Sequence, residues 1–331
     1  MLTGDSLFVG DIARPDLAVE KEEGARAMFR SLRELLGLGD DTEVWPGHLG
    51  GSMCGGPGMD QKISSTIGFE LRHNALLSET DEVRFVERAL AGLGPQPPNH
   101  RTIARMNAGP LLTGGVRAAA LSAGQVERIR AEGAMVVDVR ADLQFAEAHI
   151  PGAVLVTALR SGFGTKLAWI AQPGQQIVFV GRDDGDGLRA TRLAAAVGVR
   201  EVAGHLSGGM TTWREERRPV ARMERLSVAE LMERHRADPG LQILDVRERA
   251  EWSPVRIPGS VHQAYHDIDT VPDGIDPGRD VAVICASGQR SGIGASLLMR
   301  HGAGHVAHVV DGGIASWEAL GGPVRRDGAP V

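Results

Sequence analysis

The sequence of 331 residues lacks the features that mark secreted, membrane-bound and nucleic-acid-binding proteins. Its two cysteines, Cys54 and Cys285, lie far apart in the chain, which argues against a disulfide framework and suits a reducing compartment. No run of about 18 apolar residues occurs, and the first residues lack the basic and apolar regions of a signal peptide. The net charge of −6 provides no basic surface for nucleic acid. These absences predict a cytoplasmic protein with no nucleic-acid or membrane partner.

What the sequence does contain is an internal repeat. Hydrophobic residues make up 42% of the chain, and its length allows two or three domains. Four patterns occur twice in the same order: Leu121-Ser-Ala-Gly-Gln125 and Leu226-Ser-Val-Ala-Glu230, Val137-Asp-Val-Arg140 and Leu244-Asp-Val-Arg247, His149-Ile-Pro-Gly152 and Arg256-Ile-Pro-Gly259, Gly208-Gly-Met-Thr-Thr-Trp213 and Gly312-Gly-Ile-Ala-Ser-Trp317. We place the first repeat at 119–221 and the second repeat at 224–331.

Each repeat alternates short β-branched strands with helices, which predicts an α/β fold with a parallel sheet flanked by helices. The first pair of patterns has the residues of a helix capping box. Asp138 and Asp245 end strands, where we expect them to cap a turn or pair with a nearby arginine. Trp213 and Trp317 are expected to anchor the cores.

The stretch Cys285-Ala-Ser-Gly-Gln-Arg-Ser291 follows the apolar run 281–284 and precedes a run of small and apolar residues. This order predicts a buried strand, a tight turn at the cysteine and then a helix. Backbone N–H groups and the helix dipole would favour an anion at that turn, and a thiolate over a thiol. An isolated cysteine is more often a buried core residue, but this setting favours a nucleophile.

The stretch resembles the active-site loop of rhodaneses, sulfurtransferases with a Cys-x-x-Gly-x-Arg-Ser pattern, and matches each fixed position. Both repeats resemble rhodanese domains. The resemblance implies that Cys285 is catalytic and that the loop binds the sulfur and its donor through Ala286, Ser287, Gly288, Gln289, Arg290 and Ser291. Arg290 is expected to add positive charge near the anion. In the first repeat the same register places Gly181 and Asp186 at the positions of Cys285 and Arg290, so we expect this repeat to be a spacer or docking surface without the catalytic cysteine.

Residues 1–95 form a separate unit. We expect short strands at 7–9 and 43–45, helices at 21–38 and 80–92, and a glycine-rich loop at 50–58 that holds Cys54. Prolines and glycines predict an extended linker at 96–118.

The stretches Thr3-Gly-Asp-Ser-Leu-Phe8 and Pro46-Gly-His48 of this unit resemble the C-terminal half of a metallo-β-lactamase-fold domain, an αββα fold, and most of all the iron-dependent persulfide dioxygenases. The resemblance implies metal-ligand roles for Asp5 and His48. The His-x-His-x-Asp-His motif of that fold is absent from the sequence. We therefore expect a partial unit with a vestigial or incomplete metal site.

We conclude from the sequence that the chain is a sulfurtransferase resembling a fusion of persulfide dioxygenase with an inactive and an active rhodanese domain. Sulfane sulfur from thiosulfate or a persulfide would pass through a Cys285 persulfide to a thiol or cyanide, with no cofactor. Cys54 is a candidate relay thiol. Partners would be small sulfur compounds, and a homo-oligomer is compatible with the sequence.

One alternative is an iron-dependent dioxygenase or metallo-hydrolase, with Fe(II) or zinc, if the missing half-domain is supplied. Another is a binding module without turnover.

Overall fold

The structure, a computed structural model, describes residues 1–17, 19–49, 54–56, 58–91, 93–110, 118–159 and 162–326. Parts of the predicted glycine-rich loop (50–53 and 57) and of the predicted linker (111–117) lie outside these residues. The chain divides into two compact units, Met1–Gln96 and Pro97–Val331. No helix in the described residues has both the length and the apolar character needed to cross a membrane.

The first unit contains a small sheet in the order β1–β2–β3, with β1 parallel and β3 antiparallel to β2. Its strands are β1 (Leu2–Gly4), β2 (Glu43–Pro46) and β3 (Ser65–Thr66), and its helices are α1 (Lys21–Leu36), α2 (Ile67–His73) and α3 (Glu82–Ala91). Buried apolar side chains from the helices and from β2 form one core, which includes Leu32, Val44 and Phe85. The amphipathic patterns therefore predicted both long helices of this unit correctly.

The predicted strand at 7–9 is wrong. Leu7 makes only an isolated bridge with Ile12, and the Phe8 N–H donates to the carbonyl of Asp11 at 3.0 Å. Gly10 has a φ of 83°, which turns the chain back within a few residues. Leu7, Phe8 and Val9 are buried, so the apolar run lies in a packed turn that alternation alone does not distinguish from a strand.

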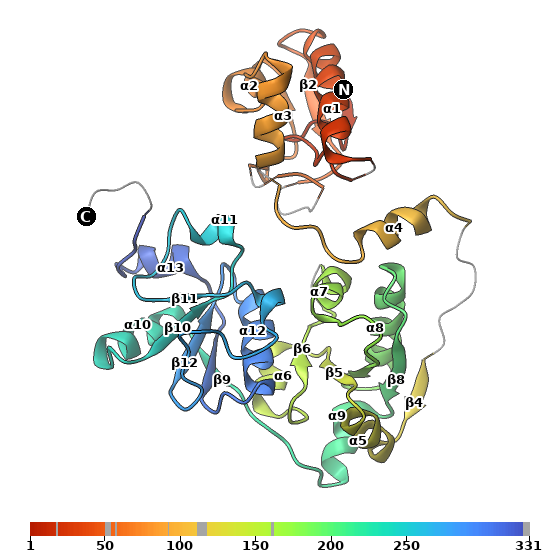
Figure 1. The fold of residues 1–331 in the computed structure, drawn as a ribbon, viewed down its shortest axis with the longest axis vertical. Helices are drawn as coiled ribbons and strands as arrows, with labels where there is room; N and C mark the ends of the chain where they lie inside the picture. The colour runs from red at the N-terminus through yellow and green to blue at the C-terminus, as the bar shows by residue number, and fades with distance from the viewer. Residues whose placement is uncertain are drawn as a thin grey trace. The chain divides into compact units, whose positions relative to one another are not determined.

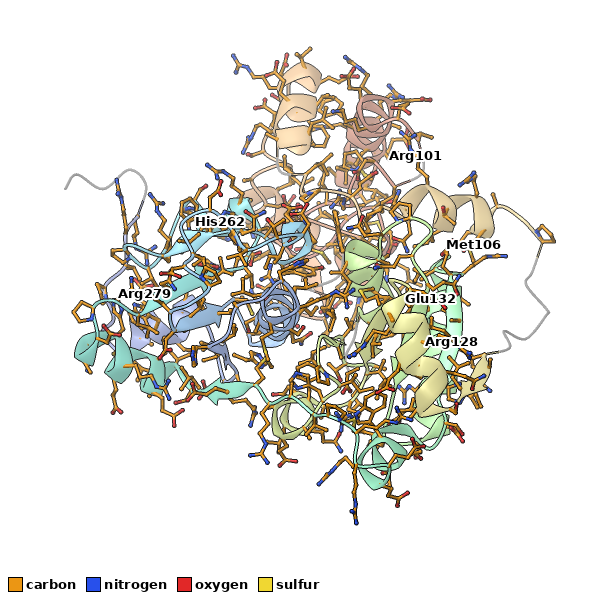
Figure 2. The ribbon with its side chains drawn as sticks, turned by 60° about the horizontal axis from the view of Figure 1, so that its bottom comes forward. Arg101, Met106, Arg128, Glu132, His262 and Arg279 are labelled. Carbon is orange, nitrogen blue, oxygen red and sulfur yellow. The ribbon has the colours of Figure 1, made fainter. Side chains whose placement is uncertain are left out.

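The prediction of an extended linker at 96–118 is also wrong in part, because α4 (His100–Asn107) begins the second unit. Its sequence contains neither proline nor glycine, so nothing in it interrupts a helix. Figure 2 labels Arg101 and Met106 on this helix. The side chains of Thr102 and Met106 lie close to Gly198, and the amide of Asn99 donates to the carbonyl of Val197. These contacts dock α4 on the turn after α8 (Asp184–Ala196).

The two repeats form two five-stranded sheets in which all strand pairs are parallel (Figure 1). The orders β4–β8–β7–β5–β6 and β9–β13–β12–β10–β11 are the same topology. The first repeat has strands β4 (Ala119–Leu121), β5 (Met135–Asp138), β6 (Val154–Leu155), β7 (Ile177–Val180) and β8 (Val202–Leu206), and helices α5 (Ala123–Ala131), α6 (Asp142–Glu147), α7 (Phe163–Ile170), α8 and α9 (Gly209–Glu215).

The second repeat has strands β9 (Glu224–Leu226), β10 (Gln242–Asp245), β11 (Val261–His262), β12 (Val281–Ile284) and β13 (Val306–Val309). Its helices are α10 (Val228–Ala237), α11 (Arg249–Trp252), the 3₁₀ helix η1 (Tyr265–Asp267), α12 (Gln289–Arg300) and α13 (Ile314–Ala319). Both predicted capping boxes are present, at Ser122 with Gln125 and at Ser227 with Glu230. The predicted α/β fold of the two repeats is confirmed.

The cores explain how the repeats are joined. Ala282 and Ile284 of β12 face a core closed by α10 and α13, which contains Trp317. Val281 and Val283 face the opposite side, where the buried cluster continues from the second repeat into the first, which holds Trp213. The two repeats therefore share one apolar core, and both tryptophans anchor cores as predicted.

Each repeat also buries an ion pair where a strand ends. Asp138 and Asp245 are 0% exposed, and their partners Arg140 and Arg247 are 7% and 4% exposed. Arg247 binds Asp245 through Nε and Nη2 and also donates to the carbonyl of Val255. The prediction that these carboxylates pair with nearby arginines is confirmed.

Asp245→Ala removes the carboxylate and leaves the Arg247 guanidinium buried without its counter-charge. We expect the free energy of unfolding of the second repeat to fall by about 3–5 kcal/mol, the range for breaking one side of a buried ion pair. Denaturant titration measures this loss. The control Asp273→Ala removes an exposed carboxylate and should change stability by less than about 0.5 kcal/mol. Equal effects of the two changes would contradict the structural role of Asp245.

Candidate functional site

Cys285 is the first residue after β12, and the pleat of that strand sets the direction of its side chain. Side chains alternate between the faces of a strand, so Cys285 lies on the face of Val281 and Val283, which α12 covers. Its side chain is fully buried. The predicted order of buried strand, turn and helix is therefore present, with the sulfur between the strand end and the start of α12.

Two groups of the loop lie within hydrogen-bonding distance of the sulfur. The backbone N–H of Gly288 points at Cys285 Sγ at 3.2 Å. The Ser291 hydroxyl donates to the carbonyl of Val309 at 3.0 Å, and its oxygen accepts a hydrogen bond from the Cys285 thiol at 3.5 Å. Both groups belong to or precede the first turn of α12, where N–H groups and the helix dipole favour negative charge.

Gly288 is required by the packing of this loop. It has a φ of 83°, a conformation that favours glycine, and a Cβ there would collide with the carbonyl of Val310 after β13. The Gly288 carbonyl is 2.6 Å from Nε2 of the buried His308. The loop after β12 is thus held directly against the end of β13.

Arg290 is bound to a carboxylate that the sequence did not indicate. Its guanidinium makes a bidentate ion pair with Glu251 of α11, in which Nη2 is 2.7 Å from Oε1. Burial opposes the charge of Glu251, but Arg290 outweighs this and lowers the pKa of the carboxyl. Burial likewise opposes the charge of Arg290, whose pKa is nevertheless raised, first by Glu251 and further by Cys285. The positive charge that was expected near the sulfur is present, but the carboxylate of Glu251 partly neutralises it.

Of the remaining loop residues, Ser287 and Gln289 lie at the boundary with the first repeat. Ala286 and Ser287 are exposed, while the amide of Gln289 accepts a hydrogen bond from Lys166 Nζ of α7 at 2.9 Å. A small pocket lies at this junction. It is lined by Asp142, Leu155, Thr157 and Lys166 of the first repeat and by Ser287, Gly288, Gln289, Ile293, His308 and Val310 of the second.

The equivalent loop of the first repeat cannot hold a sulfur anion. A Cβ at Gly181 would collide with Cβ of Asp186, so a cysteine does not fit there. The carboxylate of Asp186 accepts the backbone N–H of Arg182 at 3.0 Å and binds its guanidinium at 2.8 Å. The bond to Arg182 is the first cause of the lowered pKa of Asp186. A fixed negative charge therefore occupies the loop in place of a substrate anion.

The structure also brings together the three candidate residues of the first unit. Asp5, His48 and Cys54 each offer a ligand atom within 4.8 Å of the others. His48 Nδ1 is 2.8 Å from Asp5 Oδ1, and both side chains are about half exposed. Asp5 and His48, to which the resemblance assigns metal-ligand roles, therefore lie side by side, and Cys54 lies with them.

This cluster does not fit the iron site that the resemblance implies. Non-haem Fe(II) sites of this kind use two histidines and one carboxylate. Within the described part of the first unit, the cluster has one histidine, one carboxylate and one thiol. The direct hydrogen bond between His48 and Asp5 would also have to break before both could bind the same ion.

Three contributors to the site were missed from the sequence. Glu251 and His308 come from outside the loop, and Lys166 comes from the repeat without the cysteine. None of the three belongs to the loop motif, so the sequence contained no signal that would have assigned them to the site.

Comparison with known proteins adds family evidence to this geometry. A family model described as the rhodanese-like domain matches residues 122–216 and 227–320, more than half of the chain. YtwF of Bacillus subtilis (strain 168), whose name provisionally describes a sulfurtransferase, is 34% identical over 96 residues, 29% of this chain and 91% of that protein. YrkF of the same strain, named provisionally as a sulfur carrier protein, is 34% identical over 76 residues, and the match spans 23% of this chain and 41% of YrkF.

Among solved structures, a metallo-β-lactamase from Staphylococcus aureus subsp. aureus COL is similar to this chain. It is 26% identical with a TM-score of 0.49, and the match covers 62% of this chain and 57% of that one.

The mismatch at Asp5, His48 and Cys54 predicts that the chain does not hold catalytic iron. Protein purified anaerobically with added Fe(II) should contain far less than one iron per chain by metal analysis. It should also show no oxygen uptake with glutathione persulfide. Near-stoichiometric iron together with oxygen uptake would contradict this reading of the cluster.

Gly288→Ala should disrupt the loop from Cys285 to Ser291, because the added Cβ would clash with the carbonyl of Val310. We expect kcat/KM for sulfur transfer to fall by about 100-fold or more, since displacements near 1 Å cost that much at reacting groups. Gly302→Ala is the matched control: Gly302 also has positive φ, at 99°, but nothing lies within 4 Å of its Cβ position. That variant should keep its activity, and loss of activity in both would show that backbone strain, not the clash, decides.

Proposed function

The chain belongs to the rhodanese-like domain family, and on that premise we propose that it is a sulfurtransferase that carries sulfane sulfur on Cys285. The observation that supports this most directly is the position of the sulfur. Sγ lies at a strand end ahead of α12, and the N–H of Gly288 points at it from 3.2 Å. Such a loop stabilises an anionic sulfur better than a neutral one.

The first half-reaction loads Cys285. Its thiolate attacks the outer sulfur of thiosulfate, a bond forms between the two sulfurs, and the sulfur–sulfur bond of the donor breaks. Sulfite leaves with the electron pair of that bond. A low-molecular-weight persulfide reacts in the same way and releases its thiolate. Cys285 then carries a persulfide, which is the covalent intermediate of a two-step transfer.

The second half-reaction unloads it. Cyanide or an acceptor thiolate attacks the outer sulfur of the persulfide, and the electron pair of the breaking bond returns to Cys285. Thiocyanate or a new persulfide leaves. No cofactor takes part in either step.

The loop contributes electrostatic stabilisation rather than acid–base chemistry. The Gly288 N–H and the α12 terminus are fixed before substrate binds, so they need no reorganisation during transfer. Arg290 adds positive charge that Glu251 partly compensates and holds in position.

The role of Cys54 remains a separate hypothesis. Cys54 lies with His48 and Asp5 in the first unit, and we propose it as a relay thiol only for transfers that begin on that unit. Thiosulfate-to-cyanide transfer needs Cys285 alone.

Cys285→Ser should abolish thiosulfate:cyanide sulfurtransferase activity, because the hydroxyl forms no persulfide. Cys54→Ser is the matched control, since it removes the other cysteine of the chain, and it should keep the activity. Thiocyanate release measures both, and circular dichroism verifies the fold. Substantial turnover by Cys285→Ser would contradict the proposal, and an inactive wild-type protein would favour a binding module.

A further inference from the structure

We propose that Glu251 sets the donor preference of Cys285 and disfavours the doubly charged thiosulfate relative to donors with one negative charge, such as organic persulfides. The inference rests on the sulfurtransferase function proposed above and names the donor class of the same site. It makes Glu251 a residue that determines specificity, because the carboxylate acts on the donor through Arg290.

The cation of the sulfur loop, Arg290, is already bound by a carboxylate. Both terminal nitrogens of its guanidinium donate to Glu251, Nη1 to Oε2 and Nη2 to Oε1, the latter at 2.7 Å. A guanidinium binds an oxyanion through the same pair of parallel hydrogen bonds. An anionic donor therefore has to share Arg290 with a carboxylate that uses the edge of the guanidinium best suited to it.

The carboxylate of Glu251 is held in place from two sides. Its Oε2 also accepts the backbone N–H of Glu248 at 3.1 Å, as part of the capping box of α11. Nη1 of Arg247 donates to the Glu251 carbonyl at 2.9 Å, and the same guanidinium is fixed by the buried Asp245. Turning the Glu251 side chain away from Arg290 would also break its bond to the helix cap, so a donor does not displace the carboxylate without a free-energy cost.

The ion pair lies close enough to Cys285 for its charges to act on the reaction. The side chains of Arg290 and Glu251 are 20% and 38% exposed, so water screens their charges less than those of a fully exposed pair. Burial opposes the charge of Arg290, but its pKa is raised, first by Glu251 and then by Cys285. The sulfur and the carboxylate therefore act on the same guanidinium.

Thiosulfate is the donor that this carboxylate repels most strongly. Its sulfonate is one sulfur–sulfur bond away from the sulfur that Cys285 attacks, so the sulfonate lies near the ion pair when the outer sulfur contacts Sγ. The leaving sulfite keeps the electron pair of the broken bond and carries two negative charges. An organic persulfide has a carbon chain in that place and releases a thiolate with one charge. Because the Coulomb energy scales with the charge of the donor, Glu251 opposes a dianion about twice as strongly as a monoanion.

Two donors that differ by one charge test the role of Glu251. Methanethiosulfonate has a methyl group in place of one oxygen of thiosulfate, and attack on its outer sulfur releases methanesulfinate. Glu251→Gln removes the negative charge and keeps an oxygen that can accept the N–H of Glu248. The change should raise kcat/KM about fivefold for thiosulfate, the upper end for a partly exposed ion pair, and about twofold for methanethiosulfonate, since half the charge gives half the free energy. Thiocyanate release in the presence of cyanide measures both values.

Glu224→Gln is the matched control. Glu224 also binds an arginine of the second repeat, Arg234, through both carboxylate oxygens. It lies at the start of β9, whereas Cys285 follows the end of the parallel strand β12, so the two residues are at opposite edges of the sheet. This variant should leave both values of kcat/KM unchanged, and high salt should reduce the gain of Glu251→Gln. Lower activity of Glu251→Gln with both donors, an equal gain with both, or no change would overturn the role of Glu251.

Binding of thiosulfate separates the role of Glu251 from the proposed function. In Cys285→Ser protein, which forms no persulfide, isothermal titration gives the dissociation constant for thiosulfate. Adding Glu251→Gln should tighten binding by about the same fivefold factor. Equal dissociation constants, or no measurable binding to either protein, would overturn the role of Glu251. Tighter binding on adding Glu251→Gln, together with a wild-type protein that transfers no sulfur, would instead overturn the proposed function alone.

Discussion

The close approach of two loops at the carboxyl end of each sheet is the constraint on which the site depends. In the second repeat, side chains are excluded at Gly288 by Val310 and at Gly313 by the carbonyl of Cys285. The loops after β12 and β13 therefore touch backbone to backbone. This contact curls the loop so that the Gly288 N–H turns toward Sγ. The N–H group that points at the Cys285 sulfur is therefore held in place by the close packing at Gly288 and Gly313.

The first repeat shows the same constraint but lacks the nucleophile, since Gly181 stands at the position of Cys285. Gly209, the counterpart of Gly313, has no room for a Cβ beside Gly181 and Arg182, so the two loops remain in contact. The carboxylate of Asp186 accepts a backbone N–H of the loop. The first repeat can still present α7 and β6 to its neighbour, since the shared core holds the two repeats together.

The fold of the repeats and the nucleophile could be predicted from the sequence because both depend on local patterns. The paired motifs predicted two parallel sheets, and the loop from Cys285 to Ser291 has its chemistry in consecutive residues. Glu251 and Lys166 were not predictable in the same way, because each reaches the loop from another helix. The turn at Leu7 and the helix α4 were missed for the opposite reason: short apolar runs and proline-rich surroundings fit more than one local structure.

The proposed function requires that Cys285 carries the transferred sulfur as a persulfide. Mass spectrometry of the protein after brief exposure to thiosulfate, followed by alkylation and proteolysis, tests it most directly. The peptide containing Cys285 should gain the mass of one sulfur atom, and cyanide should remove this mass and form thiocyanate. An unmodified Cys285 peptide in protein that is turning over thiosulfate would show that the sulfur is not carried on Cys285.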